Sequence, residues 1–156
     1  MKVLYICTHN RCRSILAEAV TNHLGGPRLT ARSAGSQPAG VVHPLTLQYL
    51  AEAGIATDGL RSQSWEDLEW FDPDIVITVC DSAAGEACPL WLGKAEKFHW
   101  GLEDPSSSRV KPEAAADAFR NTIATIAKRV ALLRPISELA EHQWHQKFDS
   151  LKLHRL

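Results

Sequence analysis

Short apolar runs alternate along this chain with segments in which apolar residues recur every three or four positions. Residues 3–6 and 75–79 are continuous apolar or β-branched runs, typical of strands that are covered on both faces of a sheet. Residues 13–24 carry apolar side chains at helical spacing, and Gly25 then ends the helix that this spacing predicts. The pattern therefore predicts strands joined by helices, with the first strand at 2–6.

The following segments continue this alternation. Strands are predicted at 29–33 and 95–100, and helices at 44–53 and, as a short acidic segment, at 65–70. Because strands alternate with helices, the expected fold class is α/β. The expected architecture is a three-layer sandwich in which helices flank a four-stranded parallel sheet.

Two further apolar patterns occupy the C-terminal third. Apolar residues step by four, three, four and three positions from Phe119 to Leu133, which predicts a long helix that Pro135 is expected to interrupt. The chain is predicted to be a single domain, 1–156, in which about 136–156 is a C-terminal helical extension. The apolar face of this extension suits either a cap on the core or a surface for a partner. That face carries Trp144, Phe148 and Leu151.

Composition argues against several classes of function. The net charge of −1 gives no electrostatic reason to expect binding to nucleic acid or to an anionic membrane surface. No apolar stretch approaches the roughly 20 residues that span a bilayer. The short apolar run at the N-terminus suits a first strand better than a signal peptide. We therefore expect a cytoplasmic protein, in which cysteines tend to be catalytic, redox-active or metal-binding.

The segment from Cys7 to Ser14 joins the first strand to the first helix. The N–H groups of such a loop and the helix dipole converge on one point, which favours a bound tetrahedral oxyanion. The same field is expected to lower the pKa of Cys7 and make it a nucleophilic thiolate. Arg13, in the spacing C-x5-R, can fork onto two oxygens of the anion, Ser14 can hydrogen-bond the thiolate, and Asn10 is expected to hold the loop's shape. The predicted oxyanion-binding residues are Thr8, His9, Asn10, Arg11, Cys12, Arg13 and Ser14.

Four cysteines are present, and their spacing suits a structural zinc site poorly. Cys80 lies one residue past the strand at 75–79. If this strand neighbours the first one, Cys80 and Cys7 start at the same rim, because neighbouring strand axes lie about 4.8 Å apart. His142 and His145 are interpreted as surface residues, since no third ligand accompanies them.

Residues 7–14 resemble the phosphate-binding loop of the low-molecular-weight protein tyrosine phosphatases and of the arsenate reductases built on the same fold. The similarity covers roughly residues 1–133. It continues in the segments 33–35, 74–80 and 99–105.

The resemblance implies that Asp104, followed by Pro105, is a general acid that protonates the oxygen leaving as Cys7 attacks. The phosphatases usually follow this pair with aromatic residues that grip phosphotyrosine, whereas this chain has serines at 106–108. The chain is therefore identified as a member of the arsenate reductase branch. A low-molecular-weight phosphatase acting on phosphate monoesters is the alternative, and an oxyanion-binding module without turnover is a second one.

The reductase resemblance also implies a relay of thiols. Cys7 attacks arsenate, Cys80 attacks the Cys7 sulfur so that arsenite leaves, and Cys88 carries the oxidation outward as a disulfide. Cys88 is otherwise an ordinary buried cysteine, and Cys12 either forms a protective disulfide with Cys7 or packs the loop. An external reductant, thioredoxin or glutathione with glutaredoxin, completes the cycle, and no tightly bound cofactor is expected.

No resident metal is predicted, although the resemblance offers a partial potassium site beside the loop. The residues that match part of such a site are Asn10, Glu18 and Ser33.

Overall fold

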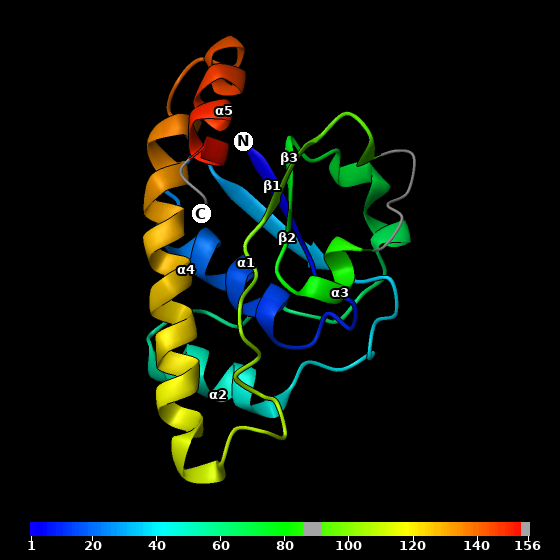
Figure 1. Cartoon of the computed structure of the whole chain (residues 1–156), viewed down its shortest axis with the longest axis vertical. Helices are drawn as coiled ribbons and strands as arrows, with labels where there is room; N and C mark the ends of the chain where they lie inside the picture. The colour runs from blue at the N-terminus through cyan, green and yellow to red at the C-terminus, as the bar shows by residue number, and fades with distance from the viewer. Residues whose placement is uncertain (86–91, 154–156) are drawn as a thin grey trace.

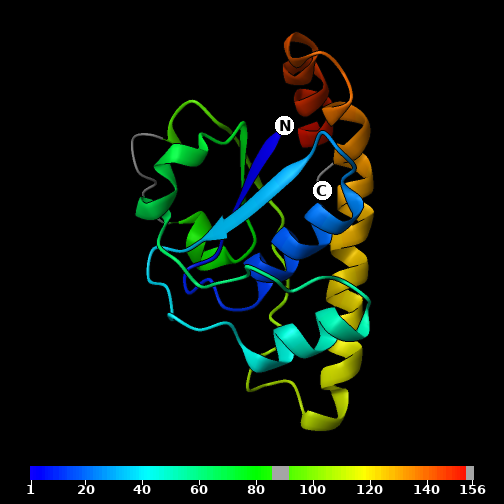
Figure 2. The same ribbon diagram turned by 180° about the vertical axis from the view of Figure 1, so that it is seen from behind.

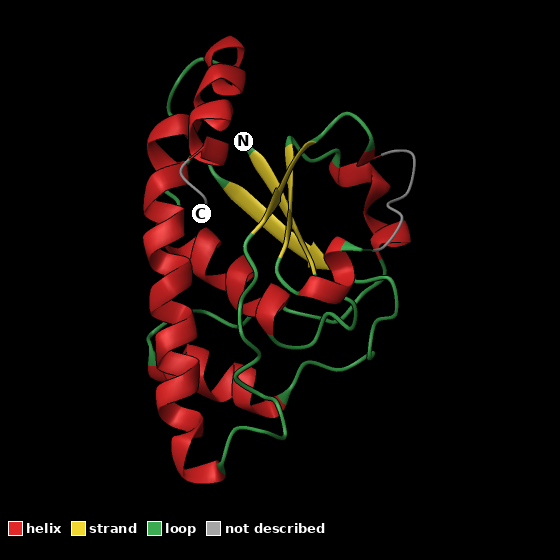
Figure 3. Cartoon of the chain, viewed as in Figure 1, coloured by secondary structure: helices red, strands yellow, loops and turns green. Residues whose placement is uncertain are grey.

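The computed structural model describes residues 1–85 and 92–153, and Cys88 lies outside these ranges. Four strands form one parallel sheet in the order β2-β1-β3-β4 (Figure 3). They are β1 (Lys2–Ile6), β2 (Thr30–Ala34), β3 (Ile75–Thr78) and β4 (Glu96–His99). The α/β class and the four-stranded parallel sheet are confirmed, and β1 and β3 are neighbours.

Helical segments cover the sheet on two sides. They are α1 (Arg13–Leu24), α2 (Pro44–Glu52), α3 (Asp81–Ala84), α4 (Ala115–Ser137) and α5 (Trp144–Leu153), with 3-10 helices η1 (Trp65–Phe71), η3 (Pro112–Ala114) and η4 (Glu141–Gln143). Helices α1, α2 and α4 lie on one side of the sheet, and η1 and α3 lie on the other (Figures 1 and 2). None of the helices in the described ranges is long and apolar enough to cross a membrane.

The register brings the carboxyl ends of the strands to one rim of the sheet. Ile6 of β1 pairs with Ala34 of β2 and with Thr78 of β3, and Thr78 pairs with His99 of β4. The loops that follow all four strands therefore start at the same edge. Ligands of open parallel sheets bind at this edge.

The two central strands are buried, because helices or turns cover both of their faces. Tyr5 of β1 is fully buried, and its hydroxyl shares a hydrogen bond of 2.7 Å with the hydroxyl of Thr21 on α1. The Tyr5 ring also contacts Trp100, with 5.4 Å between the ring centroids. This packing gives the rim a rigid base.

Helix α4 runs without a break through Pro135, so the expectation that this proline interrupts the helix is wrong. Pro135 lies in the last turn, where it removes the N–H partner of a single carbonyl, that of the exposed Ala131. Beyond it Ile136 and Ser137 are buried, and the Ser137 hydroxyl donates to the Arg134 carbonyl at 2.6 Å. Burial of this last turn outweighs the one lost hydrogen bond.

The C-terminal extension covers the core. Phe148 of α5 is buried and meets Phe98 of β4 edge-on, with ring centroids 5.7 Å apart. Trp144 packs against the same core, and its indole N–H donates to the Leu139 carbonyl at 3.2 Å. Of the two roles considered for this apolar face, these contacts support the cap on the core.

Candidate active site

The loop between β1 and α1 turns carbonyl groups toward the segment behind it. Three of these carbonyls accept backbone hydrogen bonds of 2.9 Å from residues in the segment 37–43. The three carbonyls belong to Thr8, His9 and Arg11. In a planar trans peptide the C=O and N–H groups point in opposite directions, so the N–H groups of the residues that follow face the other side of the loop. This is the cradle of N–H donors expected for an oxyanion.

Gly35, one residue past β2, allows the supporting segment to approach the loop this closely. A Cβ atom at this position would lie 2.4 Å from the carbonyl oxygens of both Cys7 and Thr8. Both of these neighbours are backbone atoms, so no side-chain rotation relieves the clash. The close approach therefore requires glycine.

Asn10 fixes the shape of the loop, as its type and position predict. It is fully buried and adopts a left-handed backbone conformation with φ 44°. Its amide nitrogen donates to the hydroxyls of Ser14 at 2.8 Å and of Ser33 at 3.0 Å. Its amide oxygen accepts from the backbone N–H of Gln63 at 2.8 Å. Asn10 therefore connects the loop to the start of α1, to β2 and to the segment before η1.

The three residues considered for potassium lie together in one hydrogen-bonded chain. The Ser33 hydroxyl donates to the Glu18 carboxylate at 2.6 Å, and burial raises the pKa of Glu18. Asn10, however, directs N–H donors at this cluster, because Gln63 holds its amide oxygen on the other side. Potassium is bound in proteins by oxygen atoms. With this amide orientation the three residues do not fit the ion, and no step below uses it.

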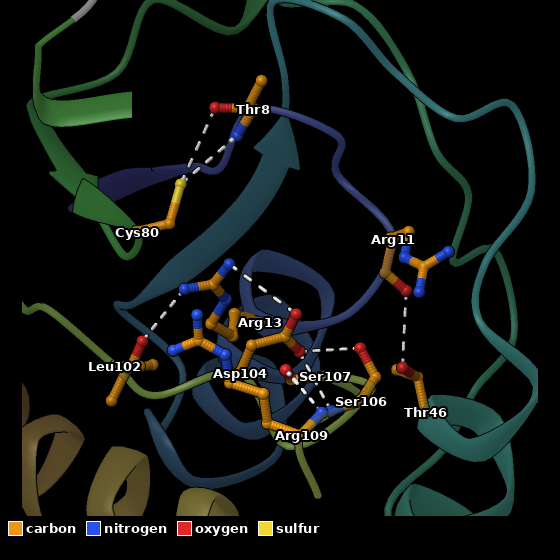
Figure 4. Close-up of polar contacts among 10 residues, drawn as sticks. All are labelled: Thr8, Arg11, Arg13, Thr46, Cys80, Leu102, Asp104, Ser106, Ser107 and Arg109. Carbon is orange, nitrogen blue, oxygen red and sulfur yellow. Dashed lines mark hydrogen bonds and ion pairs between the residues drawn. The ribbon is translucent and has the colours of Figure 1, made fainter. Parts of the chain in front are cut away.

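Cys80 follows β3 at the rim and lies beside Cys7, because β1 and β3 are neighbours. Both thiols are buried, and a side-chain hydrogen bond joins Cys7 to Cys80. The backbone N–H of Thr8 also donates to the Cys80 sulfur, at 3.5 Å, although these residues are 72 positions apart in the chain (Figure 4). The structure therefore brings the predicted nucleophile and the predicted second thiol into direct contact.

The electrostatics of this thiol pair differ from the sequence expectation. The hydrogen bond from Cys7, followed by those from the backbone N–H groups of Thr8 and Ala83, lowers the pKa of Cys80 to about 5. The pKa of Cys7 is raised, first because its proton is shared with Cys80 and second because Cys7 is buried, while Arg13 acts in the opposite direction. The two thiols therefore titrate as a pair and not as an isolated Cys7. At neutral pH the pair holds one proton and one negative charge, which the two sulfurs share, and the shared hydrogen bond favours the thiolate at Cys80.

Arg13 and Asp104 meet at the mouth of the loop. The Arg13 guanidinium donates to the carbonyl of Leu102 at 3.0 Å and lies 3.9 Å from the Asp104 carboxylate (Figure 4). The other carboxylate oxygen of Asp104 accepts from the N–H of Ser106 at 2.9 Å and from its hydroxyl at 2.6 Å. Ser106, noted in the sequence only as a departure from the aromatic pattern, orients the candidate general acid.

The side chains of three residues of the predicted loop set, His9, Arg11 and Cys12, differ in their exposure. His9 and Arg11 are exposed, and the Arg11 side chain points away from Arg13 and Cys80 in Figure 4. Cys12 is buried at the start of α1, and this burial raises its pKa to about 11. Cys12 therefore keeps its proton, which supports the packing interpretation over a protective disulfide.

Sequence reasoning missed the roles of Gln63 and Ser106. Each one fixes a functional side chain through a hydrogen bond, Gln63 holding Asn10 and Ser106 holding Asp104. No local motif marks Gln63, because its partner is far away in the chain. The serine two positions after Asp104 could have been found, since Asp side chains commonly accept hydrogen bonds from the backbone two residues on.

Comparison with known proteins agrees with this geometry. A family model described as low molecular weight phosphotyrosine protein phosphatase matches residues 2–144. A glutaredoxin arsenate reductase from Synechocystis sp. is 30% identical over 129 residues, which cover 83% of this chain and 92% of the relative.

Two solved structures are similar over most of this chain. An arsenate reductase in the phosphate-binding state shares 29% identity and a TM-score of 0.69, covering 86% of this chain and 96% of the other. A thioredoxin-dependent arsenate reductase from Corynebacterium glutamicum shares 30% identity and a TM-score of 0.67, covering 88% of this chain and 61% of the other.

Proposed function

This chain belongs to the low molecular weight phosphotyrosine protein phosphatase family, and we propose that it reduces arsenate to arsenite through a thiol relay that begins at Cys7. The observation that carries the proposal is the contact between Cys7 and Cys80 at the rim of the sheet. Hydrolysis of a phosphate ester needs no second thiol beside the nucleophile. Reduction of arsenate needs two electrons, and a pair of adjacent thiols supplies them.

The first step joins Cys7 to arsenate. The loop N–H groups and Arg13 bind the arsenate oxygens, and the Cys7 proton passes to the Cys80 thiolate that already shares it. The Cys7 sulfur attacks arsenic, a bond from arsenic to a hydroxyl oxygen breaks, and Asp104 in its acid form gives that oxygen a proton so that water leaves. Arsenic stays pentavalent in the resulting covalent thio-arsenate.

The second step transfers the electrons. The Cys80 sulfur attacks the Cys7 sulfur, and the bond between Cys7 and arsenic breaks with its electron pair left on arsenic. Arsenic becomes trivalent, the proton held by Cys80 passes to the departing arsenite, and a disulfide joins Cys7 to Cys80. The two thiols lose the two electrons that arsenic gains.

The oxidised pair then requires an external thiol reductant, and no tightly bound cofactor takes part. Cys88 remains a predicted carrier of the disulfide toward the surface. Thioredoxin and glutathione with glutaredoxin are both retained as donors, since similar proteins are described with each.

The proposal is tested by arsenate-dependent oxidation of NADPH. One assay contains thioredoxin and thioredoxin reductase, another contains glutathione, glutaredoxin and glutathione reductase, and hydrolysis of an aryl phosphate is followed in parallel. We expect arsenate turnover in at least one reductant system. Replacement Cys7→Ser should lower that turnover on the order of a thousandfold or more, because the nucleophile is lost. Replacement Cys80→Ser should stop the reduction, because no second thiol remains to attack the Cys7 sulfur. Any ester hydrolysis should be slower but still present, because the acceptor of the Cys7 proton is lost while the Cys7 nucleophile remains.

Leu132→Ala, an exposed substitution on α4 outside the loop, is the control and should leave turnover close to the wild-type value. Rapid ester hydrolysis without arsenate-dependent NADPH oxidation in either system would establish the phosphatase instead. Binding of arsenate without any turnover would identify a binding module.

A further inference from the structure

Helix α3, which follows Cys80, is tied to the sheet by a small polar cluster. Asp81 of α3 shares a hydrogen bond of 3.0 Å with the Nε2 atom of His99, and His99 Nδ1 shares one of 2.8 Å with the Thr78 hydroxyl. We call these three residues the clasp. Thr78 ends β3 and His99 ends β4, so the clasp joins two strand ends to α3. In the described ranges, Asp81–His99 is the one hydrogen bond that links an α3 side chain to another element.

The clasp brackets Cys80 in the sequence, since Thr78 precedes this cysteine by two residues and Asp81 follows it directly. A neutral imidazole serves both bonds at once, with Nε2–H donating to Asp81 and Nδ1 accepting from Thr78. Gly101 closes over the ring with φ +55°, and a Cβ atom there would lie 3.3 Å from His99 Nε2. The imidazole is therefore held in place from the strand side and from the following turn.

The same turn leads to the candidate general acid. The N–H of Leu102 donates to the carbonyl of Val79 at 3.0 Å, and the carbonyl of Leu102 accepts from Arg13 at 3.0 Å. Val79, the residue before Cys80, is therefore hydrogen-bonded to Leu102, which is the partner of Arg13 and lies two residues before Asp104. Hydrogen bonds therefore connect the residues next to Cys80 with the segment that carries Asp104, and His99 makes one of these bonds.

We propose that His99 is a positioning residue that, through Asp81 and Thr78, holds Cys80 against Cys7. Its part in the relay rests on the proposed function, whereas its hold on Cys80 does not. The side chains of Asp81 and His99 are 96% and 40% exposed. An exposed pair of this kind contributes little free energy, so the expected effect on Cys80 is modest.

The test follows alkylation of Cys80 by iodoacetamide in the reduced, folded full-length protein at pH 7, read by peptide mass spectrometry. Loss of the clasp in Asp81→Ala or His99→Ala should raise the Cys80 alkylation rate about two- to fivefold, the range expected for an exposed pair. His99→Gln should return the rate toward the wild-type value, because a carboxamide also offers one donor and one acceptor. This rescue separates positioning by hydrogen bonds from simple filling of space.

A matched control lies at the other end of the same strand. His145 of α5 pairs with Glu96, the first residue of β4, at 2.8 Å. His145→Ala removes an exposed imidazole–carboxylate pair of the same kind and should leave Cys80 alkylation unchanged. Equal Cys80 rates in His99→Ala and wild type, a similar rise in His145→Ala, or a failure of His99→Gln to restore the rate would each overturn the proposal.

The alkylation readout needs no arsenate, so it separates this inference from the proposed function. A protein that does not reduce arsenate but shows the expected Cys80 rates would refute the reductase and support the clasp. If the protein reduces arsenate but the Cys80 alkylation rate does not change in the His99 variants, the reductase is supported and the clasp is refuted.

Discussion

The two ends of the parallel sheet differ in the kind of side chains that they bury, although a histidine–carboxylate pair lies at each end of β4. At the amino end, His145 pairs with Glu96 and α5 lays Phe148 against Phe98. At the carboxyl end the interior is polar. Its buried polar residues, linked to one another by hydrogen bonds, are Asn10, Ser14, Glu18 and Ser33.

Left-handed backbone conformations at non-glycine residues occur at both ends, at Asn10 in the loop after β1 and at Asp72 before β3. The two ends differ in their unpaired polar atoms. Within the described residues, the buried side-chain polar atoms without a partner are Ser36 Oγ and Trp100 Nε1, and both belong to segments that follow strands at this end. Unpaired buried polar atoms and unusual backbone conformations cost stability and cluster at functional sites. The amino end therefore contributes stability, whereas the carboxyl end carries polar groups that cost stability and serve the chemistry.

The amino end should respond strongly in stability. Phe148→Ala removes a buried ring that α5 places on β4, and we expect the free energy of unfolding to fall by about 3–5 kcal/mol. Chemical denaturation measures the change. The exposed Leu132→Ala on α4 is the control and should cost no more than about 0.5 kcal/mol. At 25 °C the folded Phe148→Ala protein should retain wild-type Cys80 alkylation, and altered alkylation would show that the two ends are coupled.

The carboxyl end should respond in function as well as in stability. Gly35→Ala forces a Cβ atom against the carbonyls of Cys7 and Thr8, so the loop must move, at a cost of about 1–3 kcal/mol. Because the loop then loses its arrangement of N–H donors, we expect weaker arsenate binding, measured by calorimetry with the Cys7→Ser background to prevent reaction. Gly85→Ala is the control, since the nearest atom to its added Cβ is 3.8 Å away. Unchanged arsenate affinity in Gly35→Ala would contradict the role given to this contact.

The smallest expected effect is a shift in the pKa of Cys80 when Cys7 is replaced. The pKa of Cys80 is lowered to about 5, chiefly by the hydrogen bond from Cys7. The alkylation rate of Cys80 should therefore rise with pH through a midpoint near 5 and be level by pH 7, because the thiolate is the reactive form. Cys7→Ala removes the donor and should move this midpoint up by more than one pH unit, toward the ordinary thiol value near 8.5. A midpoint that does not move would show that Cys7 does not hold the charge on Cys80.

Much of the fold could be predicted because its signals are local. The limits of α1 and the position of β1 follow from apolar spacing and from the glycines after Leu24, and the structure has them as expected. The interruption at Pro135 could not be judged in this way, since the burial of Ile136 that sustains the helix depends on distant partners. The candidate site divides similarly. Cys7, Arg13 and the loop between them are evident from a strand, a loop and a helix in succession.

The sequence by itself determined which groups gather at the carboxyl rim, because strand order and parallel direction place every following loop there. Only the tertiary structure decided how those groups share their protons and hydrogen bonds: Cys7 and Cys80 share one proton, and Ser106 holds Asp104. The physical reason is the distance along the chain over which each kind of interaction acts. Periodicity and propensity act between near neighbours along the chain, whereas the Thr8–Cys80 contact joins residues 72 positions apart and depends on angstrom-scale register between strands.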